Sequence, residues 1–477
     1  MKNNKMLQII AAAAIVTTAL SAGTAEAATV KAPAKSPASK TVAAKFAVSS
    51  AQVLVNGHDV TVQMLQAGNG KLIAVSDLAK AFGASVTSAK GVITITTGKD
   101  GHNLQFQAGS KTFKLNGEAH SFTTAPVLQD NRSYVEVKPI VAALGGEILD
   151  GQTLNVLTKE RISGSFASVN FDARGQVFAV RDDADPAELL QLNSDYSSSL
   201  LSSTDNLLSM TISPSGDTAA YTDETGQLYL VALHGGSPLK LGSDTSVKTD
   251  LTWSADGKKI FFVQGDKQEK ISYITLDGKI TEVVADKVEN KSEVHVSPDG
   301  NKISYIVNIT GVASTDKDGT EDSLKIDYSS AGEQIYTLDL GVKDAKPAAV
   351  TTSADNKLYP AFLSNGSVAY LSADSDNPNA KGSIKAISAD GKNQDLINDV
   401  DVTISAASAN GNLVAAGEAA DGSNKVYSIV GGVKTEIYST KADITDLAIS
   451  ADGKRVVVVA DGKIVVIENG KASQLTK

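Results

Sequence analysis

Acidic side chains in one segment of this chain are the residues best suited to bind a hard metal ion. The candidate calcium ligands in this segment are Asp316, Asp318, Glu321 and Asp322. Calcium prefers six to eight oxygen ligands, and its binding loops place a glycine at a fixed position. Here Gly319 comes too early and Thr320 takes the next ligand position. We therefore favour a solvated acidic loop over calcium binding, and we expect no other cofactor.

The five histidines give little support for a metal centre or for hydrolysis. His58, His102 and His120 are not paired at the spacing that puts two ligands on one face of a strand or helix. His234 precedes two glycines, as in an oxyanion loop, yet a Gly-Gly pair also suits an ordinary hairpin. We expect His295 to be packed and hydrogen-bonded within a strand. The chain has no Gly-x-Ser-x-Gly motif, so the sequence predicts no catalytic residues and no metal site.

A turn of the type Ser-Pro/Ala-Asp-Gly recurs seven times and indicates the architecture that must position such residues. The copies occupy residues 172–175, 213–216, 254–257, 297–300, 363–366, 408–411 and 450–453. Successive turn glycines are 41, 41, 43, 66, 45 and 42 residues apart, mostly a period in the range of four-stranded propeller blades. Glycine supplies the positive φ of a tight turn and aspartate bonds the nearby backbone. We interpret these aspartates as turn residues and not as calcium ligands.

Each repeat also predicts four short antiparallel strands. In the third repeat these are residues 251–253, 259–263, 271–276 and 280–284. The sequence thus predicts a mainly β fold: a seven-bladed β-propeller over residues 163–477, with six blades as the alternative count, preceded by a small duplicated α+β domain. Two modes of ring closure stay open, packing of the end blades or addition of a strand from residues 153–158.

The repeats resemble those of TolB-like and other WD40-like propellers of the PD40 type. In those repeats the first strand ends in an aromatic residue before Ser-Pro-Asp-Gly, and Trp253 and Phe362 occupy that place in the third and fifth repeats. Third strands carry the expected tyrosine, at Tyr229, Tyr273, Tyr336 and Tyr427. The resemblance implies a propeller fold and leaves the ligand undefined.

The 66-residue interval contains an insertion, at about residues 308–332, that is the best local candidate for a specific role. Loops on rigid scaffolds often carry binding function. The candidate binding residues of this insertion are Asp316, Asp318, Asp322 and Asp327. The alternative, which we favour, is a solvated acidic loop.

A second internal repeat lies at residues 52–158. Residues 55–57 (Val-Asn-Gly) recur as residues 115–117 (Leu-Asn-Gly), and each Asn-Gly pair suits a tight hairpin turn. A helix is expected in each half. The expected helices are residues 76–82, with Ser76 as N-cap and Gly83 after the end, and residues 139–144.

This duplicated domain resembles the copper amine oxidase-like N-terminal domain, also called the stalk domain, of many secreted Gram-positive bacterial proteins. The matching residues are 55–57, 78–86, 115–117, 125–127, 131–135 and 140–148. The resemblance implies a stalk near the cell envelope. It does not imply an oxidase, because the Asn-Tyr pair of the copper amine oxidase catalytic domain occurs nowhere in the chain.

The N-terminal residues predict export. Lys2 and Lys5 precede an apolar stretch that ends in a small-x-small cleavage site, so we expect residues 1–27 to be a signal peptide. Residues 28–51, rich in Pro, Ala and Lys, are expected to be a linker. Cleavage changes the formal charge from −10 to −11, which disfavours nucleic-acid binding. The chain has no cysteine for lipid attachment and no second long apolar segment, so we expect no membrane insertion after cleavage.

Together these features favour a non-catalytic, exported binding or scaffold protein, either freely secreted or associated with the cell wall. Its propeller is expected to recognise a protein or a glycan, so the partner is a cell-envelope polymer or another protein. The alternative is a propeller enzyme, a polysaccharide lyase or hydrolase, with acids from different blades or a metal in the central tunnel. Five histidines and few arginines make the supply of such groups sparse, so we expect no enzyme.

Overall fold

The computed structural model describes residues 45–477 apart from several short gaps. The gaps are residues 69, 99–100, 152, 204–209, 234–235, 316–324, 328–330, 375–376 and 378. The expected signal peptide and most of the expected linker lie outside the described residues. The same holds for five residues singled out above: Asp316, Asp318, Glu321, Asp322 and His234. All described strands and helices belong to the unit Phe46–Lys477.

Two sheets and two helices of the duplicated domain enclose a large apolar core, and a smaller apolar cluster contains Leu65, Leu72, Ala74 and Tyr134. The seven-stranded sheet has the order β11-β12-β1-β2-β3-β10-β9, and the five-stranded sheet the order β4-β5-β6-β7-β8. The elements are β1 (Val48–Val55), β2 (His58–Ala67), β3 (Gly70–Ala74), α1 (Val75–Ala81), β4 (Ser85–Ala89), β5 (Val92–Thr96), β6 (Asn103–Gln107), β7 (Thr112–Leu115), β8 (Glu118–Ser121), β9 (Val127–Gln129), β10 (Arg132–Glu136), α2 (Val137–Ala143), β11 (Glu147–Leu149) and β12 (Asn155–Leu157). Ile95, Leu104, Val135 and Ile140 are fully buried in this core.

The two Asn-Gly pairs form the predicted hairpin turns. Asn56 and Gly57 have φ angles of 49° and 80° between β1 and β2. Asn116 and Gly117 have φ angles of 50° and 95° between β7 and β8. Two consecutive left-handed residues give a turn whose twist matches the flanking strands. The duplicated sequence therefore builds the same local structure in both halves.

Both helices begin earlier than the sequence predicts. α1 starts at Val75 directly after β3, and α2 starts at Val137 directly after β10. Ser76 is not the N-cap, because Ala74 holds that position and the Ser76 hydroxyl bonds Asp77 instead. β3 and β10 pair with each other, and Val75 and Val137 are buried at their ends. Packing therefore fixes the start of each helix without a side-chain cap.

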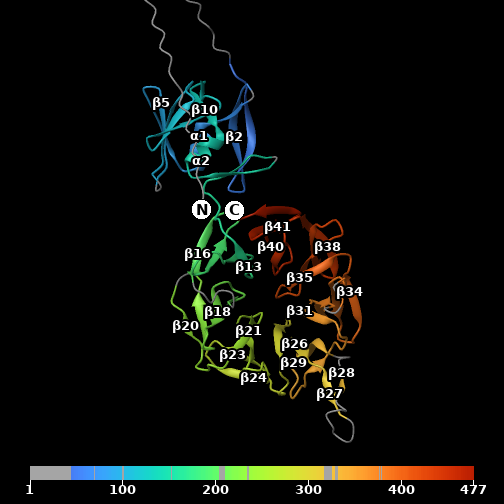
Figure 1. Cartoon of the computed structure of the whole chain (residues 1–477). Helices are drawn as coiled ribbons and strands as arrows, with labels where there is room; N and C mark the ends of the chain where they lie inside the picture. The colour runs from blue at the N-terminus through green and yellow to red at the C-terminus, as the bar shows by residue number, and fades with distance from the viewer. Residues whose placement is uncertain are drawn as a thin grey trace, which may run out of the picture. The chain divides into compact units, whose positions relative to one another are not determined.

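Residues 166–474 form seven four-stranded antiparallel sheets, which follow one another around a common centre (Figure 1). The strands, sheet by sheet, are β13 (Phe166–Phe171), β14 (Val177–Arg181), β15 (Glu188–Leu192) and β16 (Ser198–Ser203); β17 (Thr211–Ile212), β18 (Thr218–Thr222), β19 (Leu228–Ala232) and β20 (Leu239–Lys240); β21 (Lys248–Trp253), β22 (Lys259–Gln264), β23 (Lys270–Thr275) and β24 (Ile280–Val284); β25 (Lys291–Val296), β26 (Lys302–Ile309), β29 (Gly332–Asp339) and β30 (Ala348–Ala349); β31 (Asn356–Phe362), β32 (Val368–Ala373), β33 (Ser383–Ile387) and β34 (Asn393–Ile397); β35 (Asp401–Ala407), β36 (Leu413–Glu418), β37 (Asn424–Val430) and β38 (Val433–Thr440); β39 (Ile444–Ile449), β40 (Arg455–Ala460), β41 (Lys463–Glu468) and β42 (Lys471–Gln474).

The first and the seventh of these sheets pack against each other. One apolar cluster contains Leu190 of the first sheet and Val457 of the seventh. The Val169 amide also donates a hydrogen bond to the Asp446 carboxylate at 2.8 Å. The strand Asn155–Leu157 pairs with β1 and β11 in the duplicated domain. The idea that residues 153–158 add a strand to the propeller sheets is therefore wrong.

The seven repeated turns are hydrogen-bonded turns, as predicted. Each turn glycine has a φ angle between 67° and 82°, and its amide donates to the carbonyl three residues earlier at 2.8–3.0 Å. In the third turn, the Ser254 hydroxyl donates to Asp256 Oδ1 at 2.7 Å and accepts the Lys259 amide at 3.0 Å. The Ser254 hydroxyl holds the pKa of Asp256 below its usual value. This aspartate is thus part of the turn.

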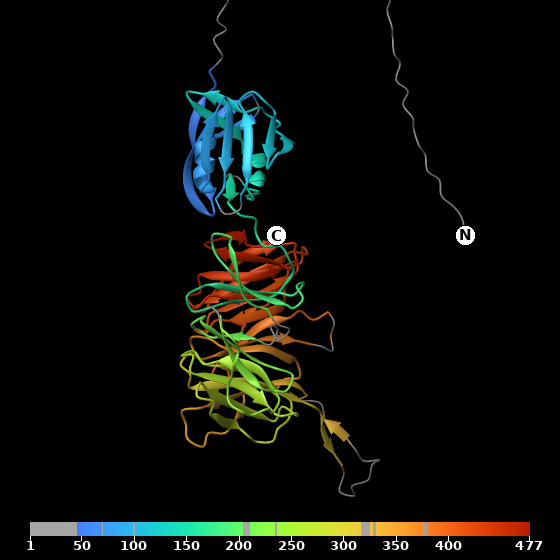
Figure 2. The same ribbon diagram turned by 90° about the vertical axis from the view of Figure 1, so that its left-hand side faces the viewer.

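The long fourth interval forms an additional hairpin between β26 and β29. β27 (Val312–Ser314) and β28 (Lys325–Asp327) pair as a separate two-stranded sheet, which projects away from the propeller sheets (Figure 2). Asp327 is the one candidate binding residue of the insertion that the structure describes, and it lies exposed at the end of β28.

Candidate functional site

A cavity of about 300 Å³ lies where the first strands of all seven sheets end. Its wall consists of the last residues of these strands and the first residues of the turns that follow. Three sheets contribute an aromatic residue directly before the turn: Phe171, Trp253 and Phe362. Ligand pockets span roughly 300–1,000 Å³ and are mostly apolar with a few polar groups. The repeat that builds the turns therefore also builds a cavity whose size lies at the lower end of the range of ligand pockets.

Trp253 also borders a second hollow, of about 390 Å³. Its indole N–H donates to the Thr211 carbonyl of the second sheet at 3.2 Å, which fixes the ring. Pro214 lines both hollows, and Leu276 at the second hollow is 51% exposed. We call the surface formed by the seven turns and these two hollows the turn face. Its aromatic and aliphatic groups are typical of recognition surfaces.

His295, which we expected to be packed and hydrogen-bonded within a strand, lines the cavity. It lies in β25, opposite Ser304 of β26. Burial lowers the pKa of His295 to about 4, so the imidazole is neutral at neutral pH. A neutral imidazole can donate one hydrogen bond and accept another.

Three first strands carry a carboxylate that reaches the next sheet, and each lies four residues before the first residue of a turn. Asp250 Oδ2 accepts a hydrogen bond from the Glu293 amide at 3.2 Å. Glu293 Oε2 in turn accepts one from the Tyr359 amide at 2.6 Å. Asp446 Oδ2 accepts one from the Val169 amide at 2.8 Å. These carboxylates therefore connect the third sheet to the fourth, the fourth to the fifth and the seventh to the first.

The pKa values of these three carboxyls are all raised by burial. The pKa of Glu293 rises to about 7, because burial disfavours its charged form and the nearby charges of Asp250 and Glu333 act in the same direction. Asp250 is open to water on one side, which limits the effect at that residue. Glu293 thus gains or loses a proton near neutral pH, where acid–base groups and switches operate.

Sequence reasoning missed these carboxylates, although the repeats contained a signal. When the seven turns are aligned, the position four residues before them holds Ser168, Ser209, Asp250, Glu293, Tyr359, Ile404 and Asp446. Six of the seven residues carry a polar group. Because the residue types differ, the position does not stand out as a motif in any single repeat.

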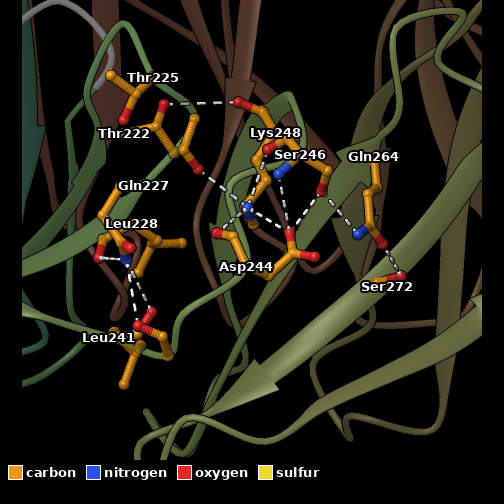
Figure 3. Close-up of polar contacts among 12 residues, drawn as sticks. Thr222, Thr225, Gln227, Leu228, Leu241, Asp244, Ser246, Lys248, Gln264 and Ser272 are labelled. Carbon is orange, nitrogen blue, oxygen red and sulfur yellow. Dashed lines mark hydrogen bonds and ion pairs between the residues drawn. The ribbon is translucent and has the colours of Figure 1, made fainter.

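A buried lysine fixes the start of the first strand in the third sheet (Figure 3). Lys248 Nζ donates to the carbonyls of Gly226, Asp244 and Ser246, each at 2.9 Å. It also pairs with Asp244 Oδ1 at 2.7 Å, and its side chain is 1% exposed. Gln264 completes the group by donating to the Ser246 hydroxyl at 2.8 Å. The ammonium group therefore acts as an internal cation that organises the loop before β21.

The fourth and fifth sheets repeat this arrangement. Lys291 and Lys357 are fully buried and donate to backbone carbonyls of the preceding loops. Lys291 pairs with Asp286 at 2.8 Å, and Lys357 pairs with Asp355 at 3.1 Å. Buried charges are tolerated when they are paired and hydrogen-bonded. The lysines therefore hold the entry of three consecutive first strands.

Two histidines of the duplicated domain lie at its surface. His58 and His120 are exposed, and His120 stacks on Phe113 with 5.2 Å between ring centroids. In the part of the chain that the structure describes, no group of three His, Asp or Glu side chains is placed to hold a metal ion. None of the described helices is long and apolar enough to cross a membrane.

Comparison with known proteins gives a family match for the duplicated domain and several solved structures of similar fold. Residues 54–158 match the family model described as the copper amine oxidase N-terminal domain. No curated protein matches the chain. Similar solved structures include an oligogalacturonate lyase in complex with manganese, with 11% identity and a TM-score of 0.46 over 64% of this chain and 89% of that chain.

Two further solved structures are similar to this chain. Puromycin hydrolase is 15% identical, with a TM-score of 0.48 over 66% of this chain and 54% of that chain. A protein described as TolB from Agrobacterium tumefaciens is 17% identical, with a TM-score of 0.38 over 54% of this chain and 91% of that chain. The match thus spans about half the length of puromycin hydrolase. At these identities the similarities concern the fold alone.

Proposed function

We propose that this chain is an exported, non-catalytic binding protein whose closed, seven-bladed propeller recognises its partner at the turn face. The observation that carries this proposal is the pair of hollows around Trp253, framed by Phe171, Phe362 and Pro214. Large rigid aromatic groups give contact area at a low cost in conformational entropy. A glycan of the cell envelope is the first candidate partner, and an envelope protein is the second.

Trp253 is the only tryptophan of the chain, so its fluorescence reports on this surface directly. Titration with soluble cell-wall glycan fragments should give a saturable change in its emission. Replacing Leu276, which is 51% exposed at the second hollow, by alanine should weaken this binding. Leu239→Ala is the matched control, because Leu239 is 70% exposed on the outer strand β20. Equal affinities of the two variants would contradict recognition at the turn face.

The duplicated domain is proposed to be the stalk that holds the propeller near the envelope. A chain beginning at Lys159 keeps the hydrogen bond between the Lys477 amide and the Ile162 carbonyl and lacks the stalk. Retention on purified cell walls should fall for this shorter chain relative to the mature chain. Equal retention of both would remove the stalk proposal. Export itself predicts that the secreted protein begins at Ala28.

A propeller enzyme acting on polysaccharides is the second candidate, favoured by the carboxyls of Asp250, Glu293 and Asp446 on the first strands of three sheets. Its test is the release of new reducing ends or unsaturated ends from wall polysaccharides. Activity that is lost in Glu293→Gln would replace the binding proposal with an enzymatic one.

Calcium binding by the insertion stays a separate, minor proposal. Binding of calcium to the folded state alone would raise the thermal midpoint, and a chelator would reverse this rise. An unchanged midpoint with and without chelator would end it.

A further inference from the structure

The first strands of the third, fourth and fifth sheets share an unusual local pattern. In each, a buried lysine is followed two residues later by a non-glycine residue in the left-handed region. The pairs are Lys248 with Asp250 (φ 54°), Lys291 with Glu293 (φ 50°) and Lys357 with Tyr359 (φ 52°). Such φ angles are uncommon outside glycine and cost free energy. Three consecutive sheets therefore hold a strained residue at the same place, directly after an anchored lysine.

The strained residues coincide with breaks in strand pairing. The register between β25 and β26 shifts between Ser292 and His295, and the register between β31 and β32 shifts between Leu358 and Ala361. The amides of the intervening residues are thus removed from the ladder, and buried amides need an acceptor. For Glu293 and Tyr359 the acceptor is the carboxylate of the preceding sheet, at 3.2 Å and 2.6 Å. The carboxylates therefore replace missing ladder bonds.

Glu293 is the middle member of this chain of contacts. Its amide donates to Asp250 on β21, and its carboxylate accepts the Tyr359 amide on β31. The Glu293 carboxyl also experiences the charge of Glu333 on β29. One residue thus connects three sheets, through its amide and its carboxylate, and its carboxyl experiences two further acidic groups.

We propose that Glu293 is a proton-operated latch between the fourth and fifth sheets: with a proton on its carboxyl it holds β25 and β31 together, and without one it loosens them. Asp250 and Glu333 face Glu293 from β21 and β29, and Tyr359 faces it from β31. The charge of Lys357 lowers the pKa of Glu333, and the charge of Asp446 raises the pKa of Tyr359. His295 on the same strand stays neutral throughout the range concerned, because burial lowers its pKa to about 4.

The direction follows from the pKa of Glu293. Burial and the neighbouring carboxylates raise it to about 7 in the closed state, whereas a hydrated glutamate in the open state titrates near its ordinary value of 4.5. The closed state therefore binds the proton more tightly than the open state. Its advantage is complete below about pH 4.5 and is lost as the pH rises through about 7.

Amide hydrogen exchange of the mature full chain tests the latch. After correction for the intrinsic pH dependence, segments covering Lys291–Val296 and Asn356–Phe362 should lose protection several-fold between pH 5 and pH 7 and then level off. In Glu293→Gln this dependence should vanish. In Glu282→Gln it should persist, because Glu282 is an exposed residue of β24 paired with Lys270.

A second variant leaves Glu293 in place. Asp250→Asn removes one of the negative charges that raise the pKa of Glu293, so the midpoint of the exchange profile should move to lower pH. Constant protection of the wild-type segments from pH 5 to pH 8 would overturn the latch. An unaltered profile in Glu293→Gln would overturn it as well, because the proton would then belong to another group.

Discussion

Asp256 in the third turn and Asp250 in the strand before it are six residues apart, yet their pKa values are shifted in opposite directions. The Ser254 hydroxyl and the Lys258 amide stabilise the charge of Asp256 and lower its pKa. Burial raises the pKa of Asp250 despite its one contact with the Glu293 amide. The same contrast separates Asp299 from Glu293 in the fourth sheet. Carboxylates of the turns thus act as fixed parts of the fold, and those of the first strands respond to pH.

The first strands that carry the responsive carboxylates Asp250 and Glu293 are held at their starts by the buried lysines. We expect the loss of one such lysine to have the largest effect on the free energy of unfolding. Lys291→Met leaves Asp286 and the carbonyls of Glu269 and Val288 without their cation. Breaking a buried ion pair in this way should lower the free energy of unfolding by about 3 kcal/mol. Urea unfolding followed by Trp253 fluorescence measures it.

Lys267→Met is the matched control, because Lys267 is 69% exposed in its pair with Glu289. It should change the free energy of unfolding by no more than about 0.5 kcal/mol. Equal effects of the two lysine variants would contradict the anchoring role.

Two turn glycines that differ in their surroundings test how tightly the turns pack. A Cβ at Gly411 would lie 2.3 Å from the Ser364 amide nitrogen, whereas a Cβ at Gly366 meets nothing within 4 Å. Both have positive φ angles, 75° and 82°, so Gly366→Ala should cost about 1 kcal/mol. Gly411→Ala should cost about 2–3 kcal/mol because overpacking adds to the strain. Thermal melts compare them, and a smaller cost at Gly411 would show that the contact between these turns is loose.

Glu333 on β29 is a further carboxyl whose pKa is raised. Burial raises its pKa, with Lys357 acting in the opposite direction, and its Oε2 atom is buried and has no hydrogen-bond partner among the residues that the structure describes. The stabilisation that its proton provides is therefore complete below the pKa of Glu333 in the unfolded chain. It is lost as the pH rises through the raised pKa of Glu333 in the folded chain. Glu333→Gln should accordingly stabilise the propeller by about 1 kcal/mol at pH 8 and have little effect at pH 4. Melting curves at the two pH values check the sign, and destabilisation at pH 8 would refute it.

The turn aspartates should give the smallest effect, with the opposite sign. The pKa of Asp256 is lowered, so its contribution is present at neutral pH and lost as the pH falls through the lowered value. Asp256 is 54% exposed, so Asp256→Asn should destabilise the fold by no more than about 0.5 kcal/mol at pH 7. The difference from wild type should shrink at pH 3. A difference that grows on acidification would contradict the interpretation of these residues.

The sequence was most informative where the chemistry of single residues is decisive. The positive φ of each turn glycine and the Asn-Gly hairpins follow from residue type, so both were predicted correctly. The helix starts depended on burial at the ends of β3 and β10, and Ser76 was wrongly chosen as a cap. Local propensity cannot reveal such packing.

The carboxylates of the first strands and the buried lysines could not be predicted from residue type in the same way. Each carboxylate binds a backbone amide of another sheet, which any acceptor of suitable length can do, so the aligned position varies from Asp to Glu. The lysine anchors are concealed by unequal spacing, because Asp244 precedes Lys248 by four residues and Asp355 precedes Lys357 by two. Their common role lies in the geometry of the loops.

The contrast between fixed and responsive carboxylates rests above all on Glu293. The most direct measurement is the free energy of unfolding of wild type and Glu293→Gln from pH 5 to pH 8, monitored by Trp253 fluorescence. Since the pKa of Glu293 is raised to about 7, the variant should gain stability over wild type as the pH rises. We expect the variant to be more stable than wild type by about 1–2 kcal/mol at pH 8, a value reduced to allow for partial hydration of the Glu293 carboxyl. A difference that stays constant from pH 5 to pH 8 would contradict the account.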